Sequence, residues 1–195
     1  MSDLTGAAAQ AIEQPHGDVI ATLLEQHRRI RELFTHVKRA EGGRKQQAFD
    51  ELRVLLAAHE TAEEMVLRPV SCMDAGAAVT DARNQEEREA TRMLTVLEVM
   101  DVSSAEFGRK FTEFEQAVLD HAAHEEQEEF PPVRARESQH TLVGMGAVLR
   151  AAEMAGPTHP HPSTAGSPIA QWMVGPWASL IDRAQDAIKA AMPGS

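Results

Sequence analysis

Two similar stretches decide the fold of this chain: HETAEEMVLRP at residues 59–69 and HEEQEEFPPV at residues 124–133. In each stretch a His is followed four residues later by a Glu, then by a second Glu, apolar residues and a Pro. Helix-favouring Ala, Leu, Glu and Arg surround them, whereas Tyr is absent and aromatic residues make up only 4% of the chain. This composition disfavours strands and predicts an all-α fold.

The His and Glu of each stretch have the spacing of neighbours on one helical face, because residues i and i+4 lie one above the other. We therefore predict that His59 and Glu63 point the same way, and that His124 and Glu128 do so on a later helix. A single H-x-x-x-E spacing arises often by chance, but two copies at matching places indicate one shared site. Inward-facing imidazoles and carboxylates of this kind hold paired iron or manganese ions in helical bundles.

Apolar residues at helical spacing predict four long helices around these stretches. They run from Asp18 to Gly42-Gly43, from there to Arg68, from Ala77 to Met100, and from Ser103 to Pro131. We expect Pro69 and Pro131 to end the second and fourth helices. Ser103 and Glu106 have the spacing of a capping box at the start of the fourth. Four such helices joined by short turns favour an up-down-up-down four-helix bundle.

The chain is predicted to consist of this bundle over residues 17–132 and a helical appendage over residues 133–195. The appendage contains a predicted helix at 137–155, the loop GPTHPHPSTAGSP, and a last amphipathic helix that begins near Pro176. We expect these C-terminal helices to pack on the bundle rather than to form a second domain, because 195 residues suit one ordinary core.

The formal net charge of −11 disfavours binding to nucleic acid or to an anionic membrane, both of which attract clustered Lys and Arg. The single cysteine, Cys72, excludes an internal disulfide and a cysteine-based zinc or iron–sulfur site within one chain. We see neither a signal peptide nor an apolar run long enough to span a membrane. A cytoplasmic protein is the expectation.

His27 lies within an apolar stripe of the first helix, in LLEQHRRIRELF. Taken alone, it would be interpreted as a core histidine with a hydrogen-bond partner. The duplicated His/Glu pattern favours a metal ligand instead, since burying Glu63 and Glu128 without a partner would cost several kcal/mol each. One zinc ion would need fewer ligands than these helices offer, so zinc is less favoured, whereas iron and manganese both stay open at this point.

These residues resemble the hemerythrin-like, or HHE cation-binding, family over roughly residues 18–132, and the tail is similar to that of actinobacterial members. The resemblance implies a non-haem di-iron centre with an oxygen or carboxylate bridge and an open position for O2 or hydrogen peroxide. By motif, it implies that the metal ligands include two bridging glutamates, Glu63 and Glu128, together with His27, His59 and His124.

The third helix departs from the family pattern. Its phrase QEEREATRML aligns with EQHRRIRELF of the first helix, and Glu87 then stands where the family has a His. We expect Glu87 to supply a carboxylate ligand, with Glu86 as a less favoured substitute; the alternative is that Glu87 is surface charge. His121 lies within about 20° of the direction of Glu128 on an ideal helix. It is expected to complete the coordination, to donate a hydrogen bond to a ligand, or to protonate a bound peroxide; a partly buried histidine without such a role is the alternative.

A site richer in carboxylates favours the oxidised metal over reversible O2 carriage. The leading hypothesis is therefore a di-iron protein that binds or turns over O2 or hydrogen peroxide, with catalase- or peroxidase-like activity as one form. A second hypothesis is an iron- or oxygen-sensing module in which the metal changes how residues 133–195 pack. A metal-free structural bundle is the third.

Overall fold

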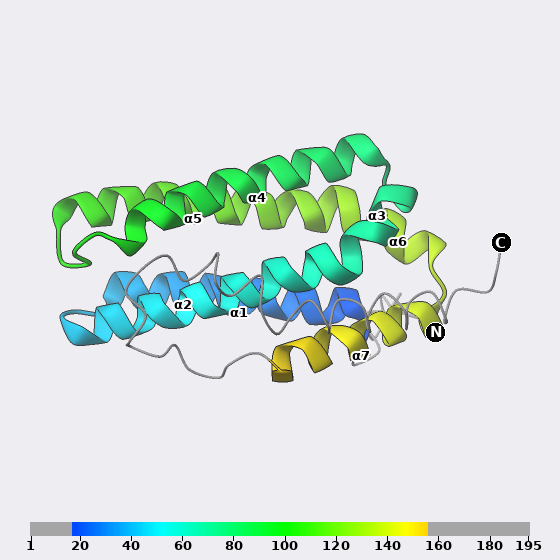
Figure 1. The fold of residues 1–195 in the computed structure, drawn as a ribbon, viewed down its shortest axis with the longest axis horizontal. Coiled ribbons are helices and arrows are strands. Elements are labelled where there is room, and N and C mark those ends of the chain that lie inside the picture. Colours follow the sequence, from blue (N-terminus) through cyan, green and yellow to red (C-terminus); the bar gives the residue numbers. More distant parts are fainter. Residues whose placement is uncertain (1–16, 156–195) are drawn as a thin grey trace, which may run out of the picture.

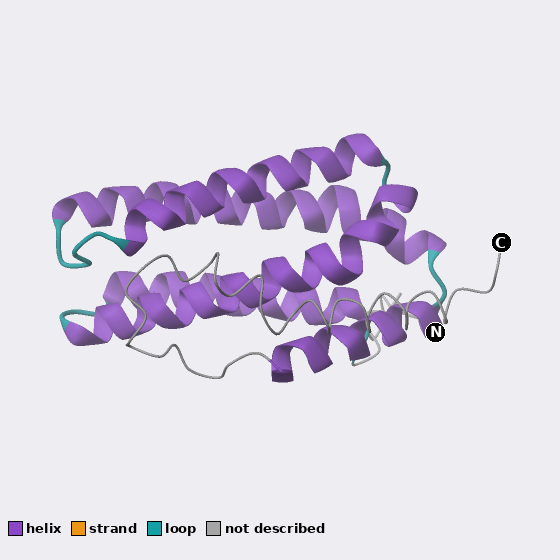
Figure 2. Cartoon of the chain, in the orientation of Figure 1, coloured by secondary structure: helices purple, strands orange, loops and turns teal. Residues whose placement is uncertain are grey.

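The computed structural model describes residues 17–155, and these are all helical or in short turns (Figure 2). Four long helices form an up-down-up-down bundle (Figure 1). They are α1 (Val19–Arg39), α2 (Gly43–Ala62), α4 (Ala77–Glu98) and α5 (Ala105–His124). The predicted all-α fold class is confirmed. None of the described helices is long and apolar enough to cross a membrane.

The helix starts show one correct and one wrong prediction. Asp18 caps α1, and its side chain accepts a hydrogen bond of 2.7 Å from the backbone N–H of Ala21. The cap of α5 is Ser104 rather than Ser103, since the Ser104 hydroxyl accepts from the N–H of Phe107 at 3.0 Å. Ser103 instead donates to Asp101 within the preceding turn, which leaves its hydroxyl unable to cap the helix.

The prolines do not end the second and fourth helices as predicted. After α2 the chain continues through a π-helical turn, η1 (Glu63–Leu67), into α3 (Arg68–Asp74). After α5 it continues in the same way through η2 (Glu125–Glu129) into α6 (Phe130–Arg136). In both turns the backbone N–H after the turn bonds to the carbonyl five residues earlier.

A wide turn suits these two sequences because a proline follows each of them. Pro69 is the second residue of α3, and Pro131 is the second residue of α6. A proline ring clashes with the carbonyl four residues before it in an α-helix and has no N–H to donate. Widening the turn relieves that clash, so the helix axis continues past the proline instead of stopping. Single π-helical turns of this kind occur often at functional sites.

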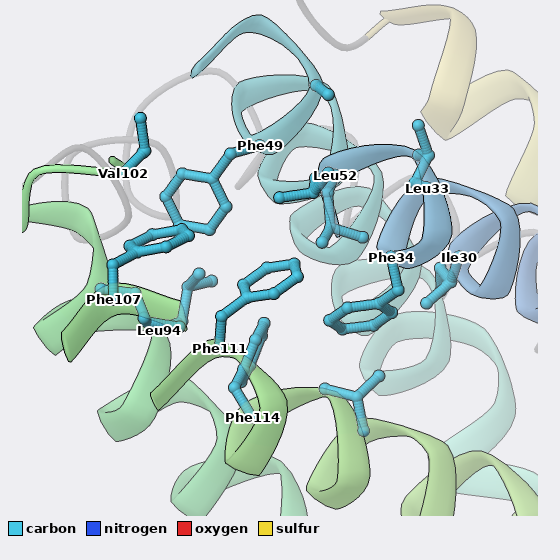
Figure 3. Close-up of a cluster of buried hydrophobic side chains, with 14 residues drawn as sticks. Ile30, Leu33, Phe34, Phe49, Leu52, Leu94, Val102, Phe107, Phe111 and Phe114 are labelled. Carbon is cyan, nitrogen blue, oxygen red and sulfur yellow. The ribbon is translucent and has the colours of Figure 1, made fainter. Parts of the chain in front are cut away.

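Two apolar clusters divide the interior of the bundle. One lies at the end with the α1–α2 and α4–α5 turns and contains the stacked and edge-to-face rings of Phe49, Phe107 and Phe111, with Phe34 beside them (Figure 3). The other lies at the opposite end. Its members come from α1, α2, η1, α3, α6 and α7. On α1 and α2 a buried histidine, His27 or His59, lies in sequence between members of the two clusters.

Helix α7 (Gln139–Ala155) packs along the α1 and α2 side of the bundle, as expected for the first part of the C-terminal appendage (Figure 1). Its Leu142 and Met145 belong to the same buried cluster as Val66 of η1. Gly146 permits the close approach, because a Cβ at that position would lie 2.2 Å from the backbone oxygen of Gly17. The loop GPTHPHPSTAGSP and the predicted last amphipathic helix lie outside the described residues.

Candidate metal centre

Six buried or nearly buried side chains converge at the middle of the bundle and form two groups. The first group contains His27, His59, Glu63 and Glu125. The second contains Glu63, Glu87, His121 and Glu125. Within each group, one possible ligand atom from every residue lies within 4.8 Å of the others. Both groups contain Glu63 and Glu125, so two adjacent groups that could each hold a cation share two carboxylates.

The inward-facing stripe of each long helix brings these residues to the same level. On α5 the stripe advances by four and three residues in turn, first through apolar residues and then through the site. Its members are Phe107, Phe111, Phe114, Val118, His121 and Glu125. The same spacing carries α1 through Ile20, Leu23, His27, Ile30 and Phe34. Because this spacing keeps side chains on one seam, the residues that fill the core also fix where the polar layer lies.

The imidazole Nε2 atoms of three histidines point into the site. His27 Nε2 lies 3.1 Å from His59 Nε2 and 3.3 Å from Glu125 Oε2. His59 Nε2 lies 3.3 Å from Glu63 Oε1, and His121 Nε2 lies 3.2 Å from Glu125 Oε1. The two oxygens of Glu125 therefore face different histidines. This is the orientation in which one carboxylate can serve two ions.

The outer nitrogen of each of these histidines is held by a side-chain oxygen. His27 Nδ1 lies 2.9 Å from Glu126 Oε1, and His59 Nδ1 lies 2.7 Å from Gln26 Oε1. His121 Nδ1 lies 3.0 Å from Glu86 Oε2. An oxygen at Nδ1 favours the tautomer with the proton there, which leaves the Nε2 lone pair directed into the site. Metal-binding histidines are oriented in this way in other proteins.

Glu63 is buried without the partners that a carboxylate needs. It is 1% exposed, and neither of its oxygens has a hydrogen-bond partner among the described residues. Burial, together with the negative charge of Glu125, raises its pKa well above the usual value for Glu. A buried carboxylate in this position is costly unless a cation lies close to it, and the Arg68 guanidinium is 3.8 Å away without a hydrogen bond to it. The donor set of carboxylate oxygens and imidazole nitrogens fits iron or manganese, because both metals bind ligands of these two types.

The neighbouring groups have shifted pKa values that suit ligands. Burial, and then the nearby His27, lower the pKa of His59 to about 3, so its imidazole is neutral at ordinary pH. Burial alone would raise the pKa of Glu125, but hydrogen bonds from His121 and His27 hold it well below the usual range. Burial alone would lower the pKa of His121, but its interaction with Glu125 raises it. Glu125 is thus charged while its neighbour Glu63 retains its proton more easily.

The structure brings together four of the six predicted ligands: His27, His59, Glu63 and Glu87. It also includes His121, which was expected as an extra ligand or a hydrogen-bond donor. Glu87 reaches the second group from α4, at the position that aligns with His27. Glu86, the less favoured substitute, lies outside both groups and contacts His121 and His124 instead.

The structure does not bring His124 and Glu128 into either residue group; the residues of the last helix in the groups stand three positions earlier. The side chain of His124 is 44% exposed, and its Nδ1 lies 2.9 Å from Glu86 Oε1. The side chain of Glu128 is 54% exposed and pairs with Arg83 at 3.1 Å. The physical reason is the apolar stripe of α5, which continues from Val118 to His121 and leaves His124 to one side.

Two signals in the sequence could have found the correct pair, His121 and Glu125. The first is the stripe of phenylalanines on the fourth helix. The second is the position of the proline: aligning the two stretches at Pro69 and Pro131 pairs HETAEEMVLRP with HAAHEEQEEFP. In both stretches a His is then followed by Glu four residues later and by Pro ten residues later. Glu125 was missed because HAAHE contains two histidines, and only the second was counted as the start of the repeat.

A cavity of about 60 Å³ adjoins the site on the side of the phenylalanine cluster. Its wall includes His27, His59 and His121 and the apolar residues Leu94 and Phe114. A space of this size takes a few molecules no larger than water, and its apolar wall suits a small neutral ligand.

Comparisons with known proteins identify the family and the fold. The sequence model of one family, described as Hemerythrin HHE cation binding domain, matches residues 18–133. An uncharacterized hemerythrin-like protein from Schizosaccharomyces pombe is 25% identical over 134 residues. The match covers 67% of this chain and 66% of that protein, so this chain spans just under two thirds of that relative's length. The crystal structure of a hemerythrin HHE cation-binding domain-containing protein from Mycobacterium kansasii covers 90% of this chain and 99% of its own, with a TM-score of 0.64 and 19% sequence identity. The last comparison shows a shared fold.

Proposed function

This chain belongs to the hemerythrin HHE cation-binding domain family, and from this we propose that its two residue groups hold a pair of non-haem iron ions that bind or turn over O2 or hydrogen peroxide. The observation that carries the proposal is the sharing of Glu63 and Glu125 between the groups. Two carboxylates that each belong to both groups fit two adjacent ions better than one. Iron is proposed ahead of manganese and zinc, since zinc would be satisfied by one closed set of four ligands.

In this proposal each residue of the two groups has a defined role. His27 and His59 supply imidazole nitrogens to the first group, and His121 with Glu87 completes the second. Glu126, Gln26 and Glu86 hold the outer nitrogens of the three histidines, which fixes the direction of the inner lone pairs. A bound pair of iron ions supplies redox chemistry toward O2 or peroxide. The cavity beside the site has a mainly apolar wall that suits a small neutral molecule.

Catalase-like disproportionation is the reaction that the site supports best, because it needs no external electron donor. One hydrogen peroxide gives up two electrons and two protons and becomes O2. A second accepts them, its O–O bond breaks, and it becomes two water molecules. Only one of the three histidines belongs to the second group, and the carboxylate Glu87 takes a histidine's place there. Hard oxygen ligands of this kind favour the oxidised metal and so oppose reversible O2 carriage.

Metal analysis and peroxide assays test this proposal. The purified chain, loaded anaerobically with ferrous iron, is expected to bind about two ions per chain, as the paired carboxylate sites of helical bundles do. Oxygen release from added peroxide, measured with an electrode, separates turnover from simple binding. A protein that saturates at one ion, or binds none, would contradict the two-ion centre. A loaded protein that releases no oxygen would be consistent with the two-ion centre but would contradict the catalase-like activity.

A second function, metal sensing, is favoured by one contact. Leu142, Met145 and Leu149 of α7 share a buried cluster with Met65 and Val66 of η1, the turn that begins at Glu63. A metal that reorients Glu63 would therefore act on residues packed against α7. Limited proteolysis of the metal-free, ferrous and ferric forms tests this idea, which fails if cleavage after residue 136 is the same in all three.

A further inference from the structure

Arg68 is a buried cation beside the candidate metal centre and belongs to neither residue group. It is the first residue of α3, directly after the π-helical turn η1, and it is 6% exposed. Its Nη1 donates to both carboxylate oxygens of Glu129, at 2.8 and 2.7 Å. Glu129 is fully buried at the end of η2. The two wide turns are thus joined across the bundle by one charge-assisted, two-pronged ion pair.

The other arm of the guanidinium reaches into the second residue group. Arg68 Nη2 lies 3.2 Å from Glu125 Oε1 and 3.8 Å from Glu63 Oε2, and it also contacts Glu87 Oε1. These are all three of the carboxylates in the second group. The first group offers the opposite oxygens of the shared pair, since Glu125 Oε2 faces His27 and Glu63 Oε1 faces His59. Arg68 Nη2 therefore lies near the carboxylate oxygens on the side of the second group and not near those that face the histidines of the first.

We propose that Arg68 is a built-in competitor for the second cation and thereby sets the order in which the two groups are loaded. The proposal rests on the proposed two-ion function. A guanidinium nitrogen and a metal ion compete for the same oxygens of Glu63, Glu87 and Glu125, and both are positively charged. The first group, which has two histidines that Arg68 does not contact, binds its ion first. The second binds more weakly and requires the guanidinium to withdraw toward Glu129.

Glu129 is the anchor that makes this withdrawal feasible. It gives the guanidinium a fully buried counter-charge outside both residue groups. With Glu129 replaced by a neutral residue, Arg68 would be attracted to the three site carboxylates alone. The second ion would then bind more weakly still. Removing Arg68 and Glu129 together would leave the net charge unchanged and eliminate the competition, so the second ion would bind more tightly.

Stepwise titration of the full chain with cobalt(II), which is redox-stable under these conditions, tests the proposal by calorimetry and by visible absorption. The unmodified chain is expected to bind two ions in separate steps. In the double variant Arg68→Leu/Glu129→Leu the second step should tighten at least about tenfold, because a charge at this distance shifts a protonation equilibrium by one to three units. In Glu129→Gln the second step should weaken. The first step should stay within a few-fold in both variants.

The pair Arg53 and Glu98 supplies the matched control. Arg53 donates to Glu98 at 2.9 and 2.5 Å between α2 and α4, and Glu98 is eleven residues along α4 from Glu87. Arg53→Leu/Glu98→Leu removes the same chemical groups and should leave both steps unchanged. Replacing both members of a buried pair by apolar residues is often tolerated, whereas removing one member alone leaves an unpaired charge. Glu129→Gln provides a second test if the double variant does not fold, as judged by circular dichroism.

The outcomes separate this proposal from the one on which it rests. A second step that is unchanged or weaker in Arg68→Leu/Glu129→Leu overturns the role of Arg68 and leaves the two-ion centre intact. A second step that is unchanged or tighter in Glu129→Gln also overturns it. If the unmodified chain binds only one ion, the two-ion function fails first, and the competition with Arg68 fails with it.

Discussion

Glu63 and Glu125 are each the first residue of a π-helical turn, and each lies six residues before a proline. Both carboxylates belong to both residue groups of the candidate metal centre. The wide turn and the shared ligand therefore occur together on two different helices. The turn keeps the chain helical through Pro69 and Pro131, so that α3 and α6 continue beyond the site and cover its end.

The assignment of His121 in place of His124 can be tested directly. His121→Ala is expected to reduce bound iron from about two ions to one per chain, because the second group then keeps carboxylates only. His124→Ala is the matched control and should retain two ions, since its side chain is 44% exposed and lies outside both groups. Iron analysis after anaerobic loading measures both. Loss of an ion in His124→Ala but not in His121→Ala would restore the original prediction.

The prolines are expected to support the metal centre through the shape of the turn. Pro69→Ala/Pro131→Ala restores two backbone N–H groups and removes two ring clashes, so an ordinary α-helical turn becomes possible. An α-helical turn would rotate Arg68, Glu129 and the residues that follow relative to the bundle. We expect iron affinity to fall about tenfold or more, as it does when the supporting shell of a metal site is disturbed. Pro132→Ala serves as the control, and equal affinities in all three proteins would contradict this role.

Acid should destabilise the metal-free protein partly through His59. Its pKa falls from 6.5 to about 3 on folding, because burial and His27 disfavour the charged imidazolium. The unfolded chain therefore binds this proton more readily, and the stabilisation that is complete above pH 6.5 is lost as the pH falls from about 6.5 toward 3. At about 1.4 kcal/mol per unit, the loss amounts to several kcal/mol.

Urea unfolding in the presence of a chelator, between pH 7.5 and pH 4, measures this loss. His59→Gln keeps a polar side chain of similar length and removes the titrating group. The free energy of unfolding is expected to fall more steeply with acid in the unmodified chain than in His59→Gln, because the other groups of the site are common to both. Parallel curves would show that His59 is not the cause.

Gly146 should be intolerant of any side chain. A Cβ there would lie 2.2 Å from the backbone oxygen of Gly17, so α7 would have to move away from α1. Gly146→Val is expected to destabilise the protein by about 1–3 kcal/mol, the usual cost of forcing atoms into a packed interface. Thermal unfolding measures it, with Gly144→Val as the control because a Cβ at Gly144 meets nothing within 4 Å. If α7 has a sensing role, Gly146→Val should also increase proteolysis after residue 136 in every metal state.

The long helices, and the four predicted site residues that the structure brings together, were predictable because they depend on short-range spacing. A stripe of apolar residues at steps of three and four identifies both a helix and its buried face. His27 and Glu87 lie in the residue groups because they stand in such a stripe, or align with one. His124 and Glu128 were misplaced because their spacing was considered without the stripe formed by Phe107, Phe111 and Phe114.

The sequence by itself determined that the chain is an all-α bundle and that histidines and glutamates on its four helices face one interior level. Those properties follow from helical periodicity, which each segment carries alone. Only the tertiary structure decided how closely Glu125 approaches Glu63 and that Arg68 reaches both of them and Glu87. The physical reason is that Glu125 lies 57 residues from Arg68 and 62 from Glu63, so their geometry depends on how whole helices rotate and pack against one another.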